Sequence, residues 1–196
     1  MTKSDRLVRI IGMVVVSLFA LSLGGALLRF LSCFRAARTA GEFPAGDYMR
    51  VYIYGRGDST VSARLSMYDT NSQEVCLVER SWASRNIVID FVSAKFSSVC
   101  YTFPLEVRGR DSSFMRGTSL SRYVNSSRGC ALAGASLELK ERDAWHTLSS
   151  FALSPMARLF EGRHISYSTL DLSPCETGKE YAVRIDWAGN VFLMEI

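Results

Sequence analysis

The longest uninterrupted hydrophobic stretch covers residues 10–28, nineteen positions without a charge, in which Ser17 and Ser22 are the only polar side chains. At about 1.5 Å of rise per residue, a helix of this length measures about 28 Å, close to the ~30 Å hydrocarbon core of a bilayer. Because lipid offers no hydrogen-bond partners to the backbone, a single span has to be helical. The pattern predicts a transmembrane anchor over residues 10–28, preceded by a cytoplasmic tail of residues 1–9.

Two other interpretations of the same apolar run are a signal peptide that is cleaved from the protein and a segment that precedes a lipidated cysteine. Gly24 and Ala26 would suit a signal-peptide cleavage site, but the apolar run continues beyond them. Ser32 before Cys33 would suit a lipidated cysteine, although a charged and an aromatic residue just upstream disrupt that motif. We therefore expect an uncleaved anchor.

Alternating polar and apolar residues replace the continuous run after a membrane-proximal tether over residues 29–47. Strands are predicted at 48–54, 61–67, 75–82, 86–92 and 99–107, with turn residues between them. Their spacing indicates a single mainly β domain over 48–196, an antiparallel sandwich or barrel-like fold. Pro104 has no backbone N–H to donate, so an edge or a bulge is expected there.

The second half of the domain gives a mixed pattern. Residues 137–146 fit either a short helix or a strand. Ser154 and Pro155 are typical of a helix start, and a short helix is predicted to end before Gly162. A strand at 164–172 and a hairpin closed by Gly189 and Asn190 complete the chain.

Charge is distributed unevenly along the chain. Residues 1–38 carry a net charge of +5, whereas residues 39–196 carry −1. The basic excess therefore flanks the predicted span, where it meets anionic lipid headgroups, and a nucleic-acid partner is not expected. Because the leader is short and basic, we expect its end in the cytoplasm and the domain outside it, in the periplasm or at the cell surface.

One polar segment of the domain, residues 108–129, concentrates arginine with glycine and serine and contains a single acid. Guanidinium groups in a loop could contact phosphate, sulfated glycan or anionic lipid. The alternative is a solvated loop whose arginines pair with acids elsewhere in the domain. The candidate anion-contact residues are Arg108, Arg110, Arg116, Arg122 and Arg128.

The cysteines bear on the compartment. Four lie beyond the membrane-proximal segment, an even number that is compatible with two disulfides in an oxidising compartment. Buried free thiols are the alternative. The candidate disulfide cysteines are Cys76, Cys100, Cys130 and Cys175.

No catalytic, cofactor or metal motif survives inspection. Residues 176–179 lack the glycine spacing of a phosphate loop, and His146 and His164, the only histidines, have no partner motif. Neither a catalytic residue nor a metal or cofactor site is therefore predicted.

We expect a membrane-anchored envelope protein with a binding or structural role, whose partner is another envelope protein or an anionic surface. Ala20 and Gly24 form a small-xxx-small pair that would support weak dimerisation through the span. An enzyme of unrecognised type is the alternative. A further alternative is a secreted or lipidated adhesion-type surface protein that displays the turn Arg56-Gly57-Asp58.

Overall fold

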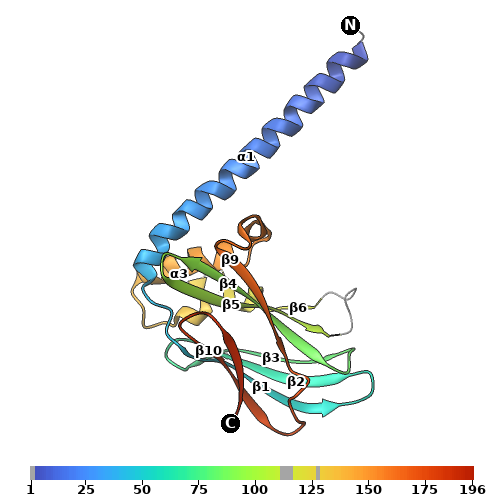
Figure 1. Cartoon of the computed structure of the whole chain (residues 1–196), viewed down its shortest axis with the longest axis vertical. Helices are drawn as coiled ribbons and strands as arrows, with labels where there is room; N and C mark the ends of the chain where they lie inside the picture. Colours follow the sequence, from blue (N-terminus) through green and yellow to red (C-terminus); the bar gives the residue numbers. More distant parts are fainter. Residues whose placement is uncertain (1–2, 111–116, 127–128) are drawn as a thin grey trace.

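A single long helix, α1 (Lys3–Ala40), precedes a compact β-rich domain in the computed structural model, which describes residues 3–110, 117–126 and 129–196. The first two thirds of α1 project away from the domain (Figure 1). Every residue from Ile10 to Gly25 is exposed, including large apolar side chains such as Phe19. This helix is long and apolar enough to cross a membrane.

The C-terminal part of α1 belongs to the folded domain. Phe30, Cys33, Ala36 and Ala37 recur at helical spacing and are buried in the hydrophobic core. The structure thus differs from the tether expected over 29–47, because residues 29–40 are helical and pack against the domain. The helix ends at Gly41, whose φ of 70° favours glycine.

The first antiparallel sheet has the strand order β11-β10-β1-β2-β3. Neighbouring hairpins account for most of its pairings, but β1 also pairs with β10, so that Gly46 lies opposite Ile185. The strands are β1 (Gly46–Arg56), β2 (Val61–Tyr68), β3 (Glu74–Trp82), β10 (Glu180–Ile185) and β11 (Val191–Glu195).

The second antiparallel sheet has the order β6-β5-β4-β9. Pro104 of β5 lies opposite Phe91 of β4, whereas Glu106 lies opposite Asp90, so the ladder has a bulge beside the proline as the sequence predicted. The strands are β4 (Ile87–Phe96), β5 (Val99–Gly109), β6 (Thr118–Ser119) and β9 (Ile165–Asp171).

Helices cover one face of this second sheet. Trp145 of α3 (Leu139–Ala152) meets Tyr101 and Phe103 of β5 at ring-centroid distances of 5.9 and 6.5 Å. On the opposite face of β5, the Thr102 hydroxyl donates to the carbonyl of Gly189 in the β10–β11 turn. The second sheet therefore lies between the helices and the first sheet, and residues from all three layers form one core.

The ambiguous stretch at 137–146 is helical. Glu138 precedes the first turn of α3, and its side chain and that of Glu141 form a reciprocal capping box. The helix predicted after Ser154 is the 3₁₀ helix η2 (Pro155–Phe160). The remaining short elements are α2 (Ser121–Val124), β7 (Asn125–Ser126), β8 (Gly129–Cys130) and the 3₁₀ helix η1 (Ala131–Ala133).

The prediction of a mainly β fold with antiparallel sheets and one N-terminal apolar helix is confirmed. Among the described strands no sheet closes on itself, so the structure does not support a barrel.

Candidate functional site

The arginine-rich segment is not a single open loop. The Arg108 guanidinium donates from Nε and from a terminal nitrogen to the two carboxylate oxygens of Asp90 on β4. Arg110 lies 2.8 Å from an Asp171 carboxylate oxygen at the end of β9. Ion pairing and the hydrogen bond to Asp90 hold the pKa of Arg108 above its ordinary value. Both arginines are therefore paired with carboxylates of the second sheet, Arg108 in a partly buried pair and Arg110 in an exposed one.

The other three candidates are not brought together with them. Arg122 lies exposed on α2 and makes no ion pair with any residue the structure describes. Arg116 and Arg128 lie outside the described residues. Two of the five arginines predicted to contact an anion are thus paired with carboxylates of the same domain.

All five cysteines are free thiols, so the expected disulfides are not formed. Cys130 and Cys175 are buried in different parts of the core, and Cys76 is half-buried on β3. Burial raises the pKa of Cys175 to about 11 and shifts that of Cys130 upward as well. These cysteines pack as small apolar side chains, as the alternative interpretation held.

The Arg56-Gly57-Asp58 turn does not present its arginine to a partner. The Arg56 guanidinium donates to the backbone carbonyls of Leu172 and Ser173, both at 3.2 Å. Its Nε is buried, with no hydrogen-bond partner among the described residues. Arg56 thus ties the end of β1 to the segment after β9, which argues against the adhesion alternative.

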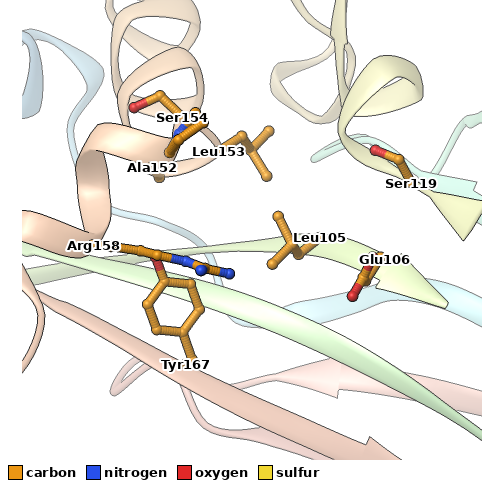
Figure 2. A pocket seen from close by; sticks show the side chains of 9 residues that line it. Leu105, Glu106, Ser119, Ala152, Leu153, Ser154, Arg158 and Tyr167 are labelled. Carbon is orange, nitrogen blue, oxygen red and sulfur yellow. The ribbon is translucent and has the colours of Figure 1, made fainter. Parts of the chain in front are cut away.

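A cleft runs across the helix-covered face of the second sheet, at the end that the helices leave open. Its deeper part, about 350 Å³, is bounded by β5, β6, the end of α3 and η2 (Figure 2). An adjoining part of about 320 Å³ extends over β4 and β9. Leu105, Glu106, Arg158 and Tyr167 line both parts.

The bulge beside Pro104 shapes this cleft. Consecutive residues of a regular strand point to opposite faces, yet Leu105 and Glu106 both line the cleft. At the bulge β5 has one residue more than β4, so the side chains of Leu105 and Glu106 can both point to the same face of the sheet. Bulges of this kind are enriched beside functional sites, where they redirect a side chain.

Close packing fixes the wall beside Glu106. A Cβ added at Gly117 would lie 2.7 Å from the Val107 carbonyl oxygen and 3.0 Å from Glu106 Oε2. Only glycine allows this approach, so β6 lies directly against β5 and carries Ser119 into the cleft.

The cleft combines charges of both signs with apolar surface. The Arg158 side chain extends across it above the Tyr167 ring, towards Leu105 (Figure 2). Glu106 and Glu161 are in no ion pair among the residues the structure describes, whereas Asp90 is occupied by Arg108 and Thr169. Arg158 is likewise in no ion pair with any residue the structure describes, so the cleft offers one cation and two carboxylates without salt-bridge partners, beside apolar surface.

His146 belongs to a hydrogen-bond network. Asn125 Nδ2 donates to Ser150 Oγ at 2.7 Å, so Asn125 Oδ1 is the acceptor that faces His146 Nδ1 at 2.6 Å. His146 Nδ1 therefore carries the proton and Nε2 is the second, unassigned nitrogen. Cys130 on β8 lies opposite Asn125 in the β7–β8 pairing, and burial raises the pKa of its thiol.

No protein-family model, curated protein or solved structure matches this chain. The geometry of the described residues is therefore the whole basis of a functional assignment. The sequence did not predict the cleft. The signal that could have indicated it is Pro104, which predicted the bulge that shapes the cleft.

Proposed function

We propose that this protein is a membrane-anchored envelope protein whose β-rich domain, an antiparallel sandwich, acts by binding and not by catalysis. The observation that carries the proposal is the continuity of α1. The helix is exposed and apolar over 10–25 and then, without a break, buries Phe30, Cys33 and Ala37 in the domain core. An apolar exposed helix is stable in lipid, and its buried end would hold the domain at a fixed orientation against the bilayer.

The domain is proposed to lie outside the cytoplasm. The free thiols remove the support that disulfides would have given for an oxidising compartment. The proposed orientation therefore rests on the basic residues before the span, Lys3, Arg6 and Arg9, which favour a cytoplasmic location for that flank.

The cleft is the proposed binding site, and its proposed partner is a segment of another envelope protein. Glu106 and Glu161 would pair with a basic side chain of that segment, while Leu105 and Tyr167 would contact its apolar part. The site lies on the same side of the second sheet as α3 and η2, so its position relative to the membrane would be fixed by α1.

Membrane insertion is tested by fractionation of the full chain. The protein should remain in the membrane pellet after alkaline carbonate extraction, and a V15R/L18R variant should be released. Each arginine at the centre of a span costs about 2.5–3.5 kcal/mol, so two of them should abolish insertion. Release of the unaltered chain by carbonate would contradict the proposal.

Orientation needs a separate reporter. Alkaline phosphatase fused after Ile196 should be active, because the enzyme folds only outside the cytoplasm. A fluorescent protein fused at the same position that is bright, together with no phosphatase activity, would place the domain in the cytoplasm and contradict the proposed orientation.

Partner binding is tested by photocrosslinking in whole cells. A photoreactive amino acid at Ser168, which lines the cleft, should yield a discrete crosslink to another protein, and E106Q should weaken it severalfold. The same probe at exposed Glu79 on β3 is the matched control and should yield none. Equal crosslinking from both positions would argue against a site in the cleft.

A further inference from the structure

A second polar cavity lies where α1 leaves the predicted span. It measures about 320 Å³ and is bounded by Arg29 and Ser32 of α1 and by His146, Thr147, Ser150 and Ser154 on the α3 side. That volume is at the lower end of the ~300–1,000 Å³ usual for ligand pockets. The cavity adjoins the cleft over β5 at Ser154, which lines both.

An adjoining cavity of about 270 Å³ shares Arg29 and runs back along the span. Leu21, Ser22, Gly25 and Ala26 form its helical wall, and Met156 of η2 faces them. Small residues on α1 leave space beside the helix, and this space lies level with the last two turns of the apolar run. The two cavities are therefore polar on one side of Arg29 and largely apolar on the other.

The depth of these cavities matches the layers of a bilayer. If residues 10–28 span the hydrocarbon, Arg29 is the first side chain at the headgroup level, and Ser32 is about 4.5 Å farther along the helix axis. Leu21 is then about 12 Å back from Arg29, within the acyl-chain region. Met156 is held at the boundary between the two layers.

The available donors favour an anion in the polar cavity. The hydroxyl of Ser32 donates to a carbonyl of α1 and that of Thr147 to a carbonyl of α3, while Ser154, just after α3, donates to the Phe151 carbonyl, so these three hydroxyls are not the donors for a ligand. Ser150 accepts from Asn125, so its O–H is available to the cavity. The Arg29 side chain, in no ion pair among the described residues, brings a positive charge and five N–H groups to the cavity.

We propose that these two cavities form one binding site for an anionic phospholipid. The headgroup phosphate binds Arg29 and Ser150 beside His146, and an acyl chain lies along Leu21, Gly25 and Met156. This inference rests on the proposed membrane anchoring. Among the described residues that line the polar cavity none is acidic, so a zwitterionic headgroup would find no counter-charge there for its cation.

The site is tested on the full chain purified in a neutral detergent. Native mass spectrometry measures binding of phosphatidylglycerol, phosphatidylcholine with the same acyl chains, and inorganic phosphate. Phosphatidylglycerol should bind several-fold more tightly than phosphatidylcholine, because both lipids present a phosphate to Arg29 but the choline cation of the second offsets that charge beside the same guanidinium. Inorganic phosphate at the same concentration should not compete, because it lacks the acyl chain.

Matched variants separate the cavity from general basic charge. R29Q should lower phosphatidylglycerol affinity about tenfold and remove most of the preference over phosphatidylcholine, and S150A should lower the affinity severalfold. R38Q removes the same charge from an exposed position on the same helix and should leave affinity unchanged. An equal loss in R38Q and R29Q would overturn the proposal.

The remaining outcomes are decisive as well. Equal affinity for the two lipids would overturn the anionic preference, and full competition by inorganic phosphate would show a free-anion site instead of a lipid site. If the chain resists carbonate extraction but shows no lipid preference, only this inference fails. If carbonate extracts the chain, the membrane anchoring itself fails.

Discussion

Phe30 joins the anchor helix to the domain. Its ring is stacked on Phe160 of η2 at 4.2 Å and lies 5.8 Å from both Phe96 of β4 and Phe151 of α3. His164 approaches its edge at 5.0 Å. One side chain of α1 thus contacts three other elements of the domain, and it is only 9% exposed.

The cost of removing this ring can be estimated from its burial. A buried Phe→Ala substitution typically lowers the free energy of unfolding by about 3–5 kcal/mol, through lost transfer energy and the cavity left behind. For a domain of this size each 1 kcal/mol lowers Tm by about 2–4 °C. We therefore expect F30A to lower Tm by about 6–20 °C, whereas F30L, which keeps most of the apolar volume, should lose less.

Thermal unfolding of the full chain in detergent micelles, followed through tryptophan fluorescence, to which the buried Trp82 and Trp145 contribute, measures this change. F19A is the matched control, because it removes the same atoms from the same helix at a position that is 70% exposed. Its Tm should equal that of the unaltered chain. If F30A unfolds within 2 °C of the unaltered chain, residues 29–40 are a loose tether and the docked helix is refuted.

Three further predictions follow from single contacts. R56A should lower the free energy of unfolding by about 1–3 kcal/mol in urea titrations, because two carbonyls lose a charged donor, whereas exposed D58A should be neutral. G189A should destabilise more than G178A by the same assay: both glycines have φ above 80°, but only at Gly189 would a Cβ collide with a neighbouring side chain, that of Cys100. Alkylation without reductant should label all five cysteines in the denatured chain. In the folded chain it should label few of them, since burial raises the thiol pKa values. If four cysteines of the denatured chain stay unlabelled, they form two disulfides.

Local patterns in the sequence predicted the local structure. Alternation of side chains gave the first five strands, and Ser154 with Pro155 gave the start of η2. Even the docked end of α1 carries a local signal, because Phe30, Cys33, Phe34 and Ala37 have the spacing of one helical face. That signal was hidden by the turn residues that follow it.

Pairings between distant segments could not be predicted in the same way. The β1–β10 pairing joins Gly46 to Ile185, and the ion pair between Arg108 and Asp90 depends on a register that the bulge sets. An arginine-rich stretch has the same composition whether its side chains meet solvent or carboxylates on neighbouring strands. Composition alone therefore suggested an anion-contact loop, where the fold instead uses two of the guanidinium groups to hold β4, β5 and β9 together.

The cleft and the lipid-level cavities share one structural cause, the packing of the helices on the second sheet. Phe30 and Phe151 bring the end of α1 and α3 together over β4, and η2 continues from α3 along both openings. Arg158 and Met156, two residues apart on η2, line the cleft and the apolar cavity respectively. A lipid bound beside Met156 would therefore contact the same six-residue helix that forms one wall of the cleft. Because η2 is so short, a shift of Met156 in the apolar cavity would also shift Arg158 in the cleft.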